Sequence, residues 1–93
     1  MTRRQWVHNY ANEHDTSIQC ADGFEDAIMG LVYRKGMGPV VLYDREKCIQ
    51  ILINRDGMDR ETAEEHFGFN VDEAWVGEST PAWAILIPPK EVK

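Results

Sequence analysis

The sequence has 93 residues, of which 43% are hydrophobic and 28% are charged, a composition typical of a globular chain. A domain of this size buries roughly 60–65% of its unfolded surface, so little interior is left for a deep pocket. The formal net charge is −6, and the stretch from residue 56 to residue 78 holds eight acids against one base, Arg60. Since a phosphate backbone requires Lys and Arg, direct nucleic-acid binding is not expected.

The chain carries no pattern for export or for membrane insertion. Its start, MTRRQWVHNY, has basic residues but no apolar segment of the kind found in a secretory signal. No apolar run approaches ~18 residues, so we expect no membrane span. Cys20 and Cys48 have no CxxC spacing and no histidine three or four residues on. We therefore expect reduced thiols in a cytoplasmic protein.

The first sixteen residues mix charged, amide and histidine side chains without a period. We expect residues 1–16 to be a flexible or loosely packed N-terminal arm, and residues 17–93 to form a single α+β domain. The alternative is one helical turn in which Trp6, Val7 and Tyr10 face the domain.

A first patterned segment begins at Asp22. Its apolar residues recur at the spacing of one helix face: Phe24, Ala27, Ile28, Leu31 and Val32. The pattern predicts a helix over residues 22–30, capped by Asp22 and ended by Gly30. Residues 31–34 and 40–43 then read as two strands of a hairpin, with a turn at residues 36–39.

Two further helices follow the hairpin. Asp44 is a candidate N-cap for a helix that carries an apolar stripe from Cys48 to Ile53 and ends at Gly57. Asp59 caps a second helix, whose inward residues are Ala63 and Phe67. The left-handed end of this helix is expected at Gly68 or Asn70.

A last strand is predicted after Pro81, over residues 82–87, which is compatible with a sheet edge. The fold class expected from these elements is α+β: a small single domain with two to three helices packed on a short, mainly antiparallel sheet. An exposed edge such as Ala82–Ile87 could pair with a second chain, which would make the protein a homodimer.

No known catalytic or metal pattern is present. Aligning Asn54–Gly57 with a calcium loop puts Leu52 and Ala63 at two essential ligand positions. The three histidines have no zinc-ligand spacing to each other or to a cysteine, and no nucleophile elbow or phosphate loop occurs. We expect no catalytic residue, no metal and no cofactor, with an enzyme as the less favoured alternative.

The acids and the tryptophans near the C-terminal end have two interpretations. As a binding surface, the acidic helix and the following loop would present these residues to a partner: Glu61, Glu64, Glu65, Asp72, Glu73, Trp75 and Glu78. The alternative is a solvated helix face, with Trp75 and Trp83 closing the core.

Residues 22–81 resemble a family of small bacteriophage and prophage proteins to which no activity is assigned. The resemblance rests on four pieces in order: DGFEDAIMG at 22–30, VVLYDREKCIQIL at 40–52, RDGMDRETAEEHFGFN at 55–70 and AWVGESTP at 74–81. Phe67-Gly68 departs from the more acidic step associated with the pattern. The resemblance implies a phage-type accessory protein of the host cytoplasm, and it implies no reaction, cofactor or ligand.

Three functional hypotheses follow. The first is a non-catalytic binding module that engages a host protein, such as a defence or nucleic-acid-handling complex, through the acidic helix and the Trp-containing loop. The second is a small-molecule or nucleotide-binding, or weakly catalytic, dimer with its site near Tyr43, Asp44, Trp75 and Glu78. The third is a purely structural subunit.

Overall fold

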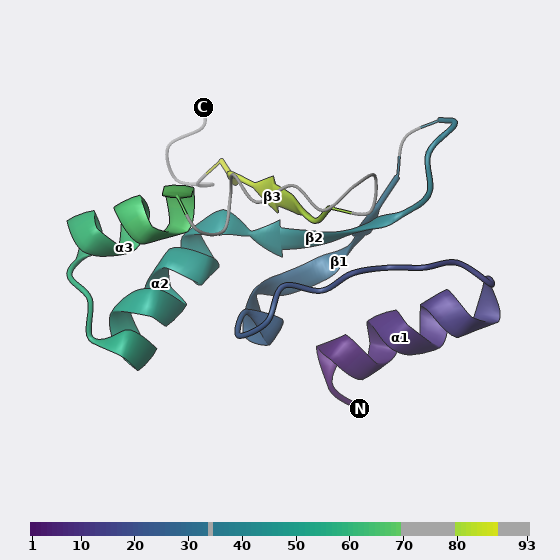
Figure 1. The fold of residues 1–93 in the computed structure, drawn as a ribbon, viewed down its shortest axis with the longest axis horizontal. Coiled ribbons are helices and arrows are strands. Elements are labelled where there is room, and N and C mark those ends of the chain that lie inside the picture. Colours follow the sequence, from purple (N-terminus) through teal and green to yellow (C-terminus); the bar gives the residue numbers. More distant parts are fainter. Residues whose placement is uncertain (34, 70–79, 88–93) are drawn as a thin grey trace.

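The computed structural model describes residues 1–33, 35–69 and 80–87 of the chain. Its elements run in the order α1 (Arg3–Glu13), the short 3₁₀ helix η1 (Glu25–Ala27), β1 (Ile28–Val32), β2 (Val40–Asp44), α2 (Arg45–Asp56), α3 (Arg60–Phe67) and β3 (Ala82–Ala84). In Figure 1, α2 and α3 lie together toward one end of the sheet and α1 toward the other. Within the described ranges, no helix is both long and apolar enough to cross a membrane.

The sheet has three strands in the order β1-β2-β3, so β2 is central. β1 and β2 pair antiparallel, which confirms the predicted hairpin, and β2 and β3 pair parallel. The register of the hairpin shifts between Ile28 and Gly30, where one extra residue forms a β-bulge. The expected α+β class is confirmed. The sheet is mixed, with one antiparallel and one parallel strand pairing.

The helix predicted over residues 22–30 is wrong. Only Glu25–Ala27 coil, as a single 3₁₀ turn, and Ile28 already begins β1. Phe24, Ala27 and Ile28 are buried, as the pattern predicted. They reach the core through the 3₁₀ turn and the start of β1, and not through one face of a helix. Pairing with β2 offers the backbone of residues 28–32 a hydrogen-bonded ladder, and this long-range interaction is absent from the local pattern.

Helices α2 and α3 begin where the sequence predicts. The Asp44 side chain accepts a hydrogen bond from the Lys47 backbone N–H at 3.3 Å, and the Asp59 side chain accepts one from the Thr62 N–H at 2.8 Å. Gly57 ends α2 in the left-handed conformation, with φ of 70°. Gly68 is not the left-handed end of α3, because its φ is −60°. Asn70, the other candidate, lies outside the described residues.

An aromatic cluster joins the elements in the core. The Phe67 ring of α3 meets the Phe24 and Trp83 rings edge-on, with centroids 6.2 and 5.0 Å away. Trp83 in turn lies 4.8 Å from the ring of Tyr43 on β2. Both Phe67 and Tyr43 are fully buried, whereas Trp83 is partly buried against them. This contact agrees with the core-closing interpretation for Trp83, while Trp75 lies outside the described residues.

Helix α1 accounts for most of the predicted N-terminal arm. Thr2 and Gln5 form a reciprocal capping box at its start. Val7 is fully buried in the common core, and the Arg3 guanidinium donates a hydrogen bond to the Ile28 carbonyl of β1. Val7 is the buried residue of α1, so one valine is its main apolar attachment to the core. That residues 1–16 are loosely packed in solution stays a prediction.

Substitution of Val7 tests how firmly α1 is attached. Val7→Ala removes two buried methyl groups, which should lower the free energy of unfolding by about 1.6 kcal/mol at ~0.8 kcal/mol per group. We expect urea unfolding to show this loss and amide exchange in residues 3–13 to accelerate. The exposed neighbour is the control: His8→Ala should change neither. A Val7→Ala protein as stable as the wild type would show that α1 is the loosely packed arm.

Candidate protein-binding surface

The structure places the acids of α3 on its outer side. Glu61, Glu64 and Glu65 are exposed, while Ala63 and Phe67 of the same helix are fully buried. This is the arrangement that the sequence predicted for the helix. The other proposed binding residues, in the loop that follows, lie outside the described residues: Asp72, Glu73, Trp75 and Glu78.

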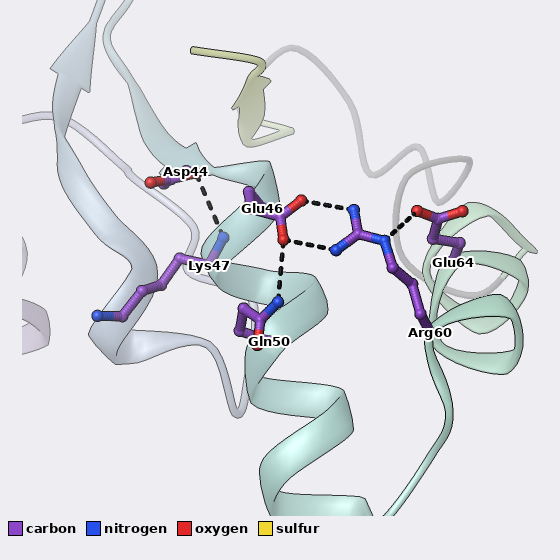
Figure 2. A network of polar contacts seen from close by, with 6 residues as sticks. All are labelled: Asp44, Glu46, Lys47, Gln50, Arg60 and Glu64. Carbon is purple, nitrogen blue, oxygen red and sulfur yellow. Dashed lines mark hydrogen bonds and ion pairs between the residues drawn. The ribbon is translucent and has the colours of Figure 1, made fainter. Parts of the chain in front are cut away.

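One arginine ties part of this acidic surface to α2. The two terminal nitrogens of Arg60 each donate to one carboxylate oxygen of Glu46, both at 2.7 Å, and its Nε donates to Glu64 at 2.9 Å. Gln50 adds a hydrogen bond to Glu46 at 3.0 Å. Figure 2 shows Arg60 reaching from α3 between the two carboxylates. The paired fork fixes the first turn of α3 against the first turn of α2.

The network sets the charge state of Glu46. Hydrogen bonds from Arg60, and then from Gln50, lower the pKa of Glu46 to about 2. The same pairing raises the pKa of Arg60 above its ordinary value. Both groups stay charged at neutral pH, so Arg60 compensates one of the two negative charges of Glu46 and Glu64.

Glu61 and Glu65 are the acids of α3 that remain available. In the part of the chain that the structure describes, neither has an ion-pair partner, in contrast to Glu64. Their charge is therefore uncompensated and faces water. The sequence grouped the three glutamates together, and the structure separates Glu64, which pairs with Arg60, from Glu61 and Glu65, which have no ion-pair partner among the described residues.

An apolar strip lies beside the start of α3. A shallow groove is lined by Asp44, Arg45, Glu46, Arg60, Ile85 and Leu86. Ile85 is 82% exposed and Leu86 is 50% exposed, directly after β3. Phe69, at the far end of α3, is 75% exposed. The strand predicted over residues 82–87 is too long, since β3 ends at Ala84, and the sequence analysis therefore did not identify Ile85 and Leu86 as exposed side chains outside the sheet. It gave Phe69 no role. The run of consecutive apolar residues at 85–87 was the sequence feature that could have indicated an exposed apolar segment.

In the alternative ligand site, Tyr43 is not accessible. Tyr43 is fully buried, its hydroxyl accepts a hydrogen bond from the Ala21 N–H at 2.7 Å, and burial raises its pKa to about 12. Asp44 is occupied as the N-cap of α2. Trp75 and Glu78 lie outside the described residues. Tyr43 thus serves the core rather than a ligand.

The two cysteines and the potential metal ligands among the described residues do not form a reactive site. Cys48 is fully buried, and burial raises its pKa to about 12, which keeps it a thiol rather than a nucleophilic thiolate. Burial raises the pKa of Cys20 as well. No group of three or more His, Cys, Asp or Glu side chains within the described part of the chain is placed to hold a metal ion.

Comparison of the chain with protein-family models, with curated proteins and with solved structures gives no significant match. The resemblance to phage and prophage proteins therefore stays a prediction.

The Arg60–Glu46 pair predicts a specific acid dependence of stability. A carboxylate whose pKa is lowered on folding contributes stability above its unfolded pKa, and loses it as the pH falls through the folded value. For Glu46 this interval runs from the ordinary value of 4.5 down to about 2. Because both side chains are about half exposed, at 52% and 53%, solvent screens the pair and its contribution to stability is small.

We expect Arg60→Gln to lower the free energy of unfolding at neutral pH by this small amount and to flatten its fall through that acid interval. Urea unfolding across the interval measures both effects. The control is Glu65→Gln, which removes an unpaired carboxylate and should keep the wild-type pH profile. A profile identical in Arg60→Gln and wild type would mean that the fork contributes nothing in solution.

Proposed function

We propose that this chain is a non-catalytic binding protein that engages a basic protein partner through the acidic surface of α3. The observation that carries the proposal concerns α3: Glu61 and Glu65 have no ion-pair partner in the described part of the chain, and the first residue of the same helix, Arg60, lines a groove with the exposed Ile85 and Leu86. A protein interface typically has such an apolar centre with a charged rim.

The two parts of the surface have different tasks in binding. Glu61 and Glu65 attract a Lys- or Arg-rich partner and orient it, which mainly raises the association rate and is sensitive to salt. Ile85 and Leu86 supply apolar area that is removed from water on binding. The Arg60–Glu46 fork keeps the start of α3 in place beside the groove, so the surface is largely preformed.

The biological setting of the proposal is a phage-type accessory protein in the host cytoplasm. The partner would then be a host protein, such as a defence or nucleic-acid-handling complex whose basic surface an acidic protein can cover. Stoichiometric binding of this kind requires neither a deep pocket nor a metal. The resemblance of residues 22–81 to phage and prophage proteins and the net charge of −6 support this setting.

Affinity capture from host lysate with a tagged chain tests the proposal. Glu61→Lys/Glu65→Lys should fold normally and lose the partner that the wild type retains, because the two acids have no structural contacts in the described part of the chain. Glu64 is left intact, since its reversal would disturb Arg60.

The matched control is Glu13→Lys/Asp15→Lys, which makes the same change in net charge at exposed positions at the end of α1. It should retain the partner. With the captured protein purified, Leu86→Ser should weaken binding with little change in its salt dependence. Equal loss of capture in both charge-reversed proteins would indicate a general charge effect, and retention by Glu61→Lys/Glu65→Lys would refute the α3 surface.

A further inference from the structure

We infer that the outer edge of β1 is a self-association surface, on which a second copy of this chain pairs its own β1 in antiparallel orientation. β1 lies at the edge of the three-stranded sheet and has one neighbour, β2. Within the described ranges, the one hydrogen bond to its backbone from outside the sheet comes from Arg3, which donates to the Ile28 carbonyl. Beyond Ile28, the outward backbone groups of β1 thus have no hydrogen-bond partner among the described residues.

The sequence of β1 lacks the usual protection of an exposed edge. Residues 28–33 read IMGLVY, without a charge or a proline. Natural proteins normally place Lys, Pro or an inward charge on a free edge strand to prevent pairing between chains. An uncharged edge strand of this kind can pair with a further strand, and the inferred self-association surface depends on this property of β1.

Apolar side chains beside the edge add area to such a contact. Met29 is 45% exposed, Val32 is 36% exposed and Tyr33 is 71% exposed. Trp6 of α1 is 47% exposed and shares a small hollow with Met29 at the start of β1. Figure 1 shows α1 beside β1 on the side away from α2 and α3. The edge and its apolar border thus form one surface.

Charge favours a second copy as the occupant. With the two bulge residues counted as one position, antiparallel pairing about a two-fold axis at Leu31 places Val32 of one copy opposite Met29 and Gly30 of the other. The same register brings Lys35, beyond one end of the strand, toward Asp26, beyond the other end. Both residues are exposed, and neither has an ion-pair partner within the described part of the chain. Two-fold symmetry makes this opposite-charge contact twice.

The same reasoning disfavours the β3 edge, which the sequence suggested as the dimer contact. The segment after β3 shares its groove with both signs of charge, Asp44 and Glu46 beside Arg45 and Arg60, and α3, which carries the exposed Glu61 and Glu65, begins at Arg60. Two copies, each of net charge −6, would there bring their acidic regions together. At the β1 edge the acids of α3 are kept apart, because α3 lies toward the other end of the sheet (Figure 1).

Sedimentation equilibrium of the full chain over a micromolar concentration range tests the inference. We expect a monomer–dimer equilibrium in the wild type. Val32→Lys and Met29→Lys should each weaken dimerisation by at least about tenfold, because both place a charge on the pairing edge. Ile85→Lys, at the β3 side, is the matched control and should keep the wild-type constant. Circular dichroism and thermal unfolding verify that each variant is folded.

A charge exchange tests the register. Asp26→Lys and Lys35→Asp should each weaken dimerisation by about threefold to tenfold, and the double variant should restore it, since the pair is re-formed with its signs reversed. A wild type that stays monomeric overturns the inference, as does a dimer dissociated by Ile85→Lys and not by Val32→Lys. A double variant weaker than either single variant overturns the antiparallel register. These outcomes are independent of host-protein capture.

Discussion

The contacts of Tyr43 hold the sheet, the preceding loop and the C-terminal strand in one arrangement. Its ring lies on β2, the central strand, against Trp83 of β3, while its hydroxyl accepts the backbone N–H of Ala21 from the segment before η1. Because the side chain is fully buried, an unmade hydrogen bond there would cost about 1–3 kcal/mol. Phe67 extends the contact to α3 through Trp83. The position of the acidic helix therefore depends on the same residue that the sequence offered as a ligand contact.

The parts of the fold that the sequence predicted correctly are those determined by local chemistry. Asp44 and Asp59 satisfy helix N-terminal N–H groups within their own turn, and Gly57 provides a left-handed helix end. The parts that it missed depend on distant segments. Residues 28–32 have apolar spacing that suits a helix, yet β2 supplies a ladder that a helix cannot use. The parallel pairing of β2 with β3 joins segments about forty residues apart, which no local pattern specifies.

The candidate surface was predictable in composition but not in the state of each residue. The density of acids identified the outer side of α3, because an amphipathic helix must place them in water. The sequence could not show that Arg60 binds Glu64 and reaches across to Glu46, since the partner lies fourteen residues away on α2. The sequence also could not show that Ile85 is exposed, because an apolar residue that follows a strand can lie in the core or on the surface.

The distribution of charge distinguishes the two proposed surfaces. Among the described residues Glu61 and Glu65 have no ion-pair partner, so under the proposed function their charge would attract a basic partner and repel a second copy of the same chain. The β1 edge carries no charge from residue 27 to residue 33, and this stretch is bordered by Asp26 on one side and by Arg34 and Lys35 on the other, so it repels a second copy least. A dimer joined at β1 would carry two copies of the α3 surface directed away from the contact. Self-association would thus raise the avidity for a partner with repeated basic sites without covering the surface that binds it.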